Sequence, residues 1–304
     1  MNNKKRNAQL NKFIFLVIII TIFLIITRII FNIFEFPEVL EILRDVDYYM
    51  RLEEVNNGLF EFYNPDKDFP AVYLYYWYFM FLPMSVIPTE IGLYIWDGLR
   101  LISTIYVMKN VPKITDNQRD LFIFYGGTLF GYFLDGYFNN CNFIIQLLLL
   151  ESYFSWEKEK KWIAGILFTL ALYKINVIIY LPILGLIKKL RVKDLIYYLL
   201  PIGLLSIVYI IFPNFFLQMI TNWMNFEGQE PVVFTPFSFI IIFNLITWQA
   251  LQPAQLMYFC LIIIIISEYF QDIKKRNRFR NFVVIGLTSY YTLEIILLIL
   301  FPPV

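Results

Sequence analysis

The chain has 304 residues, of which 59% are hydrophobic, 20% aromatic and only 16% charged. Soluble domains carry roughly a quarter charged residues, so this composition indicates an integral membrane protein without a soluble catalytic domain. The 25 basic and 24 acidic residues give a net charge of +1 and do not favour a nucleic-acid partner.

The residue types that are missing narrow the possible chemistry. The sequence contains no histidine, which excludes imidazole zinc sites, Ser-His and Cys-His nucleophile pairs and histidine proton relays. The two cysteines, Cys141 and Cys260, lie far apart in apolar surroundings and are expected to be buried hydrophobic residues. Acid–base chemistry must therefore use carboxylates, lysine or tyrosine.

The first apolar run, residues 13–31, is long enough to cross a bilayer core of ~30 Å. No small-residue cleavage site follows it, so we interpret it as a span rather than a signal peptide. Basic residues precede the run and acidic residues follow it, which places residues 1–12 in the cytoplasm and residues 35–70 outside. We expect one transmembrane domain over residues 1–304, with the remaining spans in residues 71–304.

Further apolar runs follow to the end of the chain, and several are too short to span a membrane. Three basic clusters indicate cytoplasmic loops, at residues 158–161, 188–193 and 274–280. The chain between the first two clusters is too short for two crossings, so we expect a broken or re-entrant pair with Lys174 near its tip. The predicted fold is all-α, a polytopic bundle of about 8–10 helices. Its short elements require a cavity, which we expect on the outer side.

The outer loop is rich in carboxylates. Residues 37–56 alternate apolar and charged side chains at helical spacing, which predicts an amphipathic helix lying in the membrane interface. Its apolar stripe consists of Val39, Leu40, Leu43, Val46 and Met50. This helix would hold Asp45 and Asp47 at the mouth of the cavity. On a regular helix the two carboxylates point about 200° apart, so either the helix begins or breaks there or only one is catalytic. The alternative is that both are solvated surface carboxylates.

Lys174 is the second candidate. It is flanked by apolar residues, and an ionisable group in such a run needs a counter-ion or access to water. It could hold a lipid phosphate or extend to the membrane interface. The asparagines of the Asn139-Asn140-Cys141-Asn142 segment could bind sugar hydroxyls, or they could cap a helix.

Other polar and aromatic groups favour structural roles. Asp97 and Arg100 lie three residues apart in an apolar run, which predicts a structural ion pair within the membrane. The aromatic block at residues 73–81 is typical of an interfacial belt and of packing. Residues 214–236 are expected to form a second, polar outer loop.

Several of these segments together resemble the GT-C superfamily of polytopic glycosyltransferases. Asp45-Val46-Asp47-Tyr48-Tyr49 is similar to its Asp-Tyr-Tyr segment, and Phe69-Pro70-Ala71-Val72-Tyr73 to its proline-containing entry to the next span. Downstream, Ala164-Gly165, Lys174, and Pro182 before Lys188-Lys189 look like its Ala-Gly, lysine and basic pattern. The closest similarity is to the mannosyltransferases that use polyprenyl-phosphate mannose.

This resemblance implies transfer of a hexose, with mannose expected, from a polyprenyl-phosphate donor to a glycolipid or glycan acceptor at the outer face. Asp45 or Asp47 would be the base, and Lys174, with Arg51 as second choice, would bind the donor phosphate. Sugar or acceptor would contact Asn140, Asn142 and Tyr49.

No cofactor is expected, although Mg²⁺ or Mn²⁺ could bind two aspartates. The expected location is the plasma membrane, with many crossings, a cytoplasmic N-terminus and lipid as its surroundings. The alternatives are a transporter or flippase of lipid-linked sugars, which predicts essential charges at the midplane and pseudo-symmetric halves, and a non-catalytic membrane subunit.

Overall fold

The computed structural model describes residues 3–34, 46–67, 71, 73–137, 139–174, 177–178, 180–182, 190–226, 255–268 and 281. Every regular element within these ranges is a helix. The all-α prediction is therefore confirmed for the part of the chain that the structure describes.

The first helix, α1 (Asn3–Ile33), has two different faces. Val17, Thr21 and Leu24 follow one another at helical spacing and are buried, and Arg28 continues the same stripe one turn later. The opposite face exposes large apolar side chains, among them Phe15, Ile19, Ile22, Phe23 and Ile26. A face of this kind is typical of a helix that lies against lipid on one side and protein on the other.

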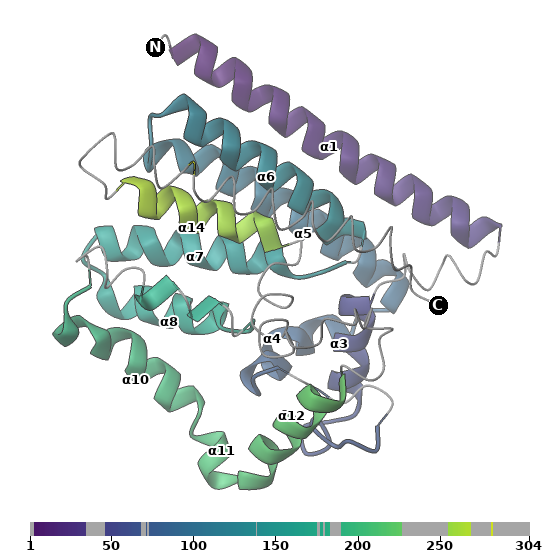
Figure 1. Ribbon diagram of the computed structural model, residues 1–304. Coiled ribbons are helices and arrows are strands. Elements are labelled where there is room, and N and C mark those ends of the chain that lie inside the picture. Colours follow the sequence, from purple (N-terminus) through teal and green to yellow (C-terminus); the bar gives the residue numbers. More distant parts are fainter. Residues whose placement is uncertain are drawn as a thin grey trace, which may run out of the picture.

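Four helices run alongside one another next to α1 (Figure 1). They are α5 (Thr89–Asn110), α6 (Gln118–Tyr137), α7 (Asn142–Glu157) and α14 (Leu256–Glu268). The short helix η1 (Val111–Lys113) ends α5. Helix α1 packs against both α5 and α6, while α14 packs against α6 and α7. The turn between α6 and α7 lies at the C-terminal end of α1, where Arg28 bonds the side chain of Asn139.

Helix α8 (Lys161–Ala171) is too short to cross a bilayer, as its segment was predicted to be. It packs against α7 and against α10 (Ile196–Leu205), which follows the short helix η3 (Val192–Leu195). Lys174 lies in the bend just after α8. This agrees with its predicted place near the tip of a short element; residues 183–189 lie outside the described residues.

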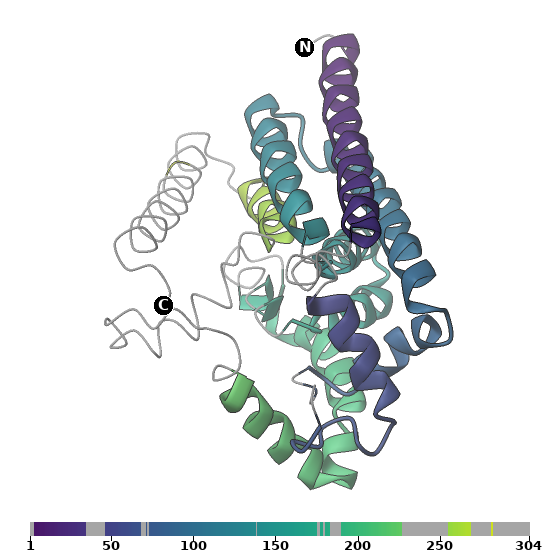
Figure 2. The same ribbon diagram turned by 90° about the vertical axis from the view of Figure 1, so that its right-hand side faces the viewer.

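Three helices gather at the end of the bundle remote from the N-terminus (Figures 1 and 2). They are α3 (Val46–Asn56), α4 (Tyr76–Ser85) and α12 (Pro213–Phe226), the last reached through α11 (Val208–Ile211). Asn222 of α12 donates hydrogen bonds of 3.0 Å to the carbonyl oxygens of Tyr63 and Ala71. Burial raises the pKa of the Tyr63 hydroxyl, which stays neutral and donates to the carbonyl oxygen of Tyr73 at 2.6 Å.

Two sequence predictions in this region are corrected. Residues 214–226, expected to be part of a polar loop, form most of α12, because Phe215, Met219 and Asn222 are buried at helical spacing. The rest of that predicted loop lies outside the described residues. In α3 the buried stripe includes Tyr48, Leu52 and Val55, whereas Met50, the one residue of the predicted stripe whose side chain is described, is only half-buried. The reason is that the Tyr48 ring packs on α4 and α5.

Two described segments are long and apolar enough to cross a membrane by length and composition, Asn7–Ile30 and Thr89–Lys113. This is compatible with membrane association. The bundle of about 8–10 helices stays a prediction, because it requires more spans than these two segments.

Gly165 allows α8 and α10 to approach closely. A Cβ atom at this position would overlap the backbone carbonyl of Tyr197, which cannot move aside as a flexible side chain could. We expect Gly165→Ala to lower the free energy of unfolding by about 1–3 kcal/mol, measured by thermal unfolding of the purified protein. Gly126→Ala is the matched control, because a Cβ there meets nothing within 4 Å, and it should be neutral or slightly stabilising. Equal stability of the two variants would contradict the described contact.

Candidate functional site

A network of buried charges links three helices. Arg28 of α1 and Arg100 of α5 both bond to the carboxylate of Asp97, and the Arg100 Nε donates to Asp135 of α6 at 3.0 Å. All four side chains are at most 2% exposed. The predicted Asp97–Arg100 ion pair is confirmed, and it belongs to a larger network that the sequence analysis did not anticipate. Two carboxylates compensate two guanidinium groups here, which is what allows these charges to be buried.

Asn139 ties this network to the turn between α6 and α7. Its side-chain oxygen accepts hydrogen bonds from Arg100 at 2.9 Å and from Arg28 at 3.3 Å. The residue has a positive φ of 50°, a left-handed conformation that asparagine tolerates better than most residues. Its carbonyl oxygen accepts from the Trp96 indole at 3.3 Å. The turn is thus held by side chains from α1 and α5.

Lys174 and Asn140, both predicted site residues, are brought together. The Lys174 ammonium donates to the side-chain oxygen of Asn140 at 2.7 Å, and Lys174 is only 8% exposed. The backbone N–H of Asn140 donates to the carbonyl oxygen of Asp135 at 2.8 Å, which places this pair beside the charged network. The bond to Asn140 directs the lysine into the protein, so the alternative of extension to the membrane interface is not supported.

Asn142, the third asparagine of the segment, is fully buried at the start of α7. Its backbone N–H donates to Asp135 at 3.0 Å, whereas neither side-chain nitrogen nor oxygen finds a hydrogen-bond partner among the described residues. The N-cap residue of α7 is Cys141, and the side chain that bonds the first backbone N–H of the helix is that of Asp135. The helix-cap interpretation of the asparagines is therefore wrong. A buried amide of this kind is costly unless a water or a ligand group satisfies it.

Helix α3 carries the predicted residues Asp47, Tyr49 and Arg51. Asp45 lies outside the described residues, and Asp47 is in the first turn of α3 with its side chain undescribed, so a metal at this pair is untested. Tyr48, next to Asp47, is buried with its ring 5.5 Å from Trp96, the residue that bonds Asn139. The backbone of Asp47 is therefore fixed close to the asparagine turn.

Arg51, the second predicted phosphate ligand, lies in the middle of α3. Its guanidinium pairs with Glu54 one turn later in α3 and stacks over the Tyr73 ring at 4.3 Å, and the side chain is 1% exposed. Tyr73 in turn packs on Tyr173, beside Lys174, at 4.2 Å between ring centroids. The role of Arg51 as a second phosphate ligand is not supported, because Glu54 already compensates its charge.

A cavity of about 420 Å³ opens where α1, α3 and α5 meet. It is lined by Arg28, by Tyr49 and by the start of α5, namely Pro88 to Glu90, Leu93 and Tyr94. Tyr49 therefore lines this cavity, whereas Asn140 and Asn142, with which it had been grouped, do not. The cavity reaches the buried charges through Arg28, which also bonds Asn139.

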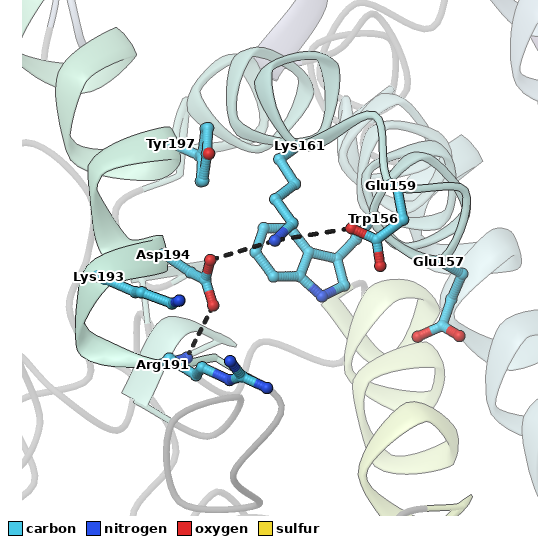
Figure 3. Close-up of a pocket in the computed structure, with 8 residues that line it drawn as sticks. All are labelled: Trp156, Glu157, Glu159, Lys161, Arg191, Lys193, Asp194 and Tyr197. Atoms are coloured by element: carbon cyan, nitrogen blue, oxygen red, sulfur yellow. Dashed lines mark hydrogen bonds and ion pairs between the residues drawn. The ribbon is translucent and has the colours of Figure 1, made fainter.

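A second cavity of about 410 Å³ lies at the opposite end, between the α7–α8 turn and η3 (Figure 3). Lys161 bridges Asp194 at 3.2 Å and Glu159 at 3.6 Å and lies over the Trp156 ring at 5.2 Å. The hydrogen bond to Asp194 raises the pKa of Lys161, which stays a cation. Three acids and three bases line the cavity, and Figure 3 shows Lys161 between Asp194 and Glu159, with Glu157 directed away from them. We interpret the Lys161 ion pairs as a structural link that holds η3 and α10 to α8.

Sequence reasoning missed Arg28 and Asp135. A signal was present for both, because each is an ionisable residue within or at the end of an apolar run, and such residues mark functional or paired sites.

Comparisons with protein-family models, with curated proteins and with solved structures give no match for this chain.

Proposed function

We propose that this protein is an inverting membrane glycosyltransferase that resembles the GT-C superfamily. It moves a hexose, with mannose the first candidate, from a polyprenyl-phosphate donor to a glycolipid or glycan acceptor at the outer face of the plasma membrane. In this proposal the chain crosses the membrane many times with its N-terminus in the cytoplasm. The apolar side chains exposed along α1 and α10 support contact with lipid.

One observation supports the proposal most strongly. The first turn of α3, which carries Asp47, lies at the same end of the bundle as the Lys174–Asn140 pair, and a cavity of about 420 Å³ opens between α1, α3 and α5. Tyr48 joins α3 to the asparagine turn through Trp96. The helical turn that bears Asp47, a buried cation and a cavity thus lie near one buried charged network, which suits a preorganised active site.

In the proposed reaction, proton transfer and stabilisation of the leaving phosphate are carried out by different residues of this site. The Asp45 or Asp47 carboxylate accepts the proton of an acceptor hydroxyl as that oxygen forms its bond to the anomeric carbon. The bond from the anomeric carbon to the phosphate oxygen breaks at the same time, and polyprenyl phosphate leaves with the electron pair. Lys174 stabilises the charge that develops on this phosphate.

The experiment that tests the proposal is a donor survey with the purified protein in liposomes. Labelled hexoses on polyprenyl phosphate, nucleotide sugars and lipid-linked acceptors are supplied in turn, and products are separated from donors. We expect label to move to the acceptor only from polyprenyl-phosphate donors. Movement of intact donor across the bilayer without a transferred sugar would instead identify a flippase.

Replacing Lys174 with methionine is expected to reduce kcat for transfer by about 10²–10³-fold, because one charged group at the developing phosphate is lost. The measurement is steady-state transfer at saturating acceptor. Lys109→Met, an exposed lysine near the far end of α5, is the matched control and should keep full activity. Unchanged transfer by Lys174→Met would contradict the role given to this residue.

Topology gives an independent prediction. Both native cysteines are buried, so single cysteines placed at exposed positions can be labelled with little background. In intact cells we expect a membrane-impermeant maleimide to label Asn56→Cys at the end of α3, whereas Glu159→Cys should react only after permeabilisation. The reverse pattern would place α3 in the cytoplasm and contradict an outer-face site.

A further inference from the structure

Arg28 has one donor that the buried network does not use. Its two terminal nitrogens bond Asp97 and Asn139, whereas its Nε finds no hydrogen-bond partner among the described residues. The side chain is 2% exposed and lines the cavity between α1, α3 and α5. An N–H group buried beside a cavity of about 420 Å³ indicates that a ligand or water accepts from it.

The other lining groups face the same hollow from α3 and α5. On α5, Glu90, Leu93 and Asp97 follow one helical face, so the carboxylate of Glu90 lies two turns outward from the Arg28–Asp97 pair. The Thr89 hydroxyl adds a second small polar group at the start of α5. Tyr49 and Tyr94 contribute aromatic rings from two different helices.

The balance of charge decides which ligand suits this lining. Asp97 already pairs with Arg28, and the Glu90 carboxylate would repel a phosphate, so the cavity does not favour an anion. A neutral polyhydroxylated ring satisfies every group: its hydroxyl oxygens accept from the Arg28 Nε, its hydroxyl hydrogens donate to Glu90, and its C–H face packs on tyrosine.

We infer that this cavity binds a neutral sugar unit of the acceptor glycan. The inference rests on the proposed function, in which the donor phosphate is held on the other side of the network by Lys174. Asn139 and Asn140 are adjacent in the chain and connect the two sides, because Asn139 bonds Arg28 and Asn140 bonds Lys174. The acceptor sugar and the donor phosphate would therefore lie at opposite ends of one site.

The test measures sugar binding without requiring activity. A panel of methyl hexosides, with methyl α-D-mannopyranoside first, is titrated by saturation-transfer NMR against the protein in phosphatidylcholine nanodiscs that contain no sugar detergent. We expect saturable binding that Glu90→Gln weakens about tenfold, since a charged hydrogen-bond acceptor is lost. Tyr94→Ala should weaken it as well. Both residues are exposed, so both variants should fold, and their unfolding temperatures verify this.

Glu159→Gln, an exposed glutamate at the opposite end, is the matched control and should bind as the wild type does. Equal affinity in the Glu90→Gln variant, absence of saturable binding for the whole panel, or displacement of the sugar by inorganic phosphate would each overturn the sugar-site inference. Binding that depends on Glu90 without any sugar transfer would leave the cavity assigned and defeat the transferase proposal. Sugar transfer with an acceptor KM that Glu90→Gln leaves unchanged would support the transferase proposal and overturn the sugar-site inference.

Discussion

Replacing Asp97 with alanine is expected to lower the free energy of unfolding by about 3–5 kcal/mol, the cost of leaving a buried charge without its partner. Asp97 bonds both Arg28 and Arg100, and all three side chains are at most 2% exposed. The alanine variant keeps both guanidinium groups in the interior with Asp135 as the one carboxylate bonded to either of them among the described residues. Unfolding in detergent, followed by circular dichroism, measures the loss.

A double-mutant cycle separates this effect from ordinary loss of packing. When Arg28→Met is added to Asp97→Ala, Arg100 and Asp135 remain as a matched pair. The double variant should therefore be less destabilised than the sum of the two single variants, with a coupling of about 1–3 kcal/mol. Asp66→Asn, an exposed carboxylate, controls for loss of charge and should be nearly neutral. Strict additivity in the cycle would contradict the buried network.

Local patterns predicted the parts of the fold that depend on neighbouring residues. The apolar run at residues 13–31 is the greater part of α1, and α8 is as short as the spacing of basic clusters required. The buried face of α3 was not predicted, because its burial follows from Tyr48 packing on Phe81 and Trp96, residues distant in sequence. Helix α12 was missed because polar residues obscured its stripe of buried residues.

The same distinction explains what could be predicted of the candidate site. The Asp97–Arg100 pair is separated by one helical turn and was readable from spacing. Arg28 lies 69 residues from Asp97, and Asp135 lies 35 residues from Arg100. Nothing in the local pattern indicates that these residues meet. The Lys174–Asn140 contact also spans 34 residues; the sequence singled out both residues but did not predict that they bond to each other.

The aspartates of the α3 segment have the largest expected effect on activity. Loss of the general base should lower kcat by about 10²–10⁴-fold, and either Asp45→Asn or Asp47→Asn should show this loss. If one residue is the base, the double variant falls no further than the more severe single variant. Glu53→Gln, on the same helix, is the matched control and should retain activity.

The most direct measurement is single-turnover transfer of labelled hexose from polyprenyl phosphate to an acceptor, with the double variant Asp45→Asn, Asp47→Asn compared with the wild type in the same liposomes. We expect the double variant to bind the donor and to transfer at least about a hundredfold more slowly. Transfer at the wild-type rate would show that neither Asp45 nor Asp47 is the base.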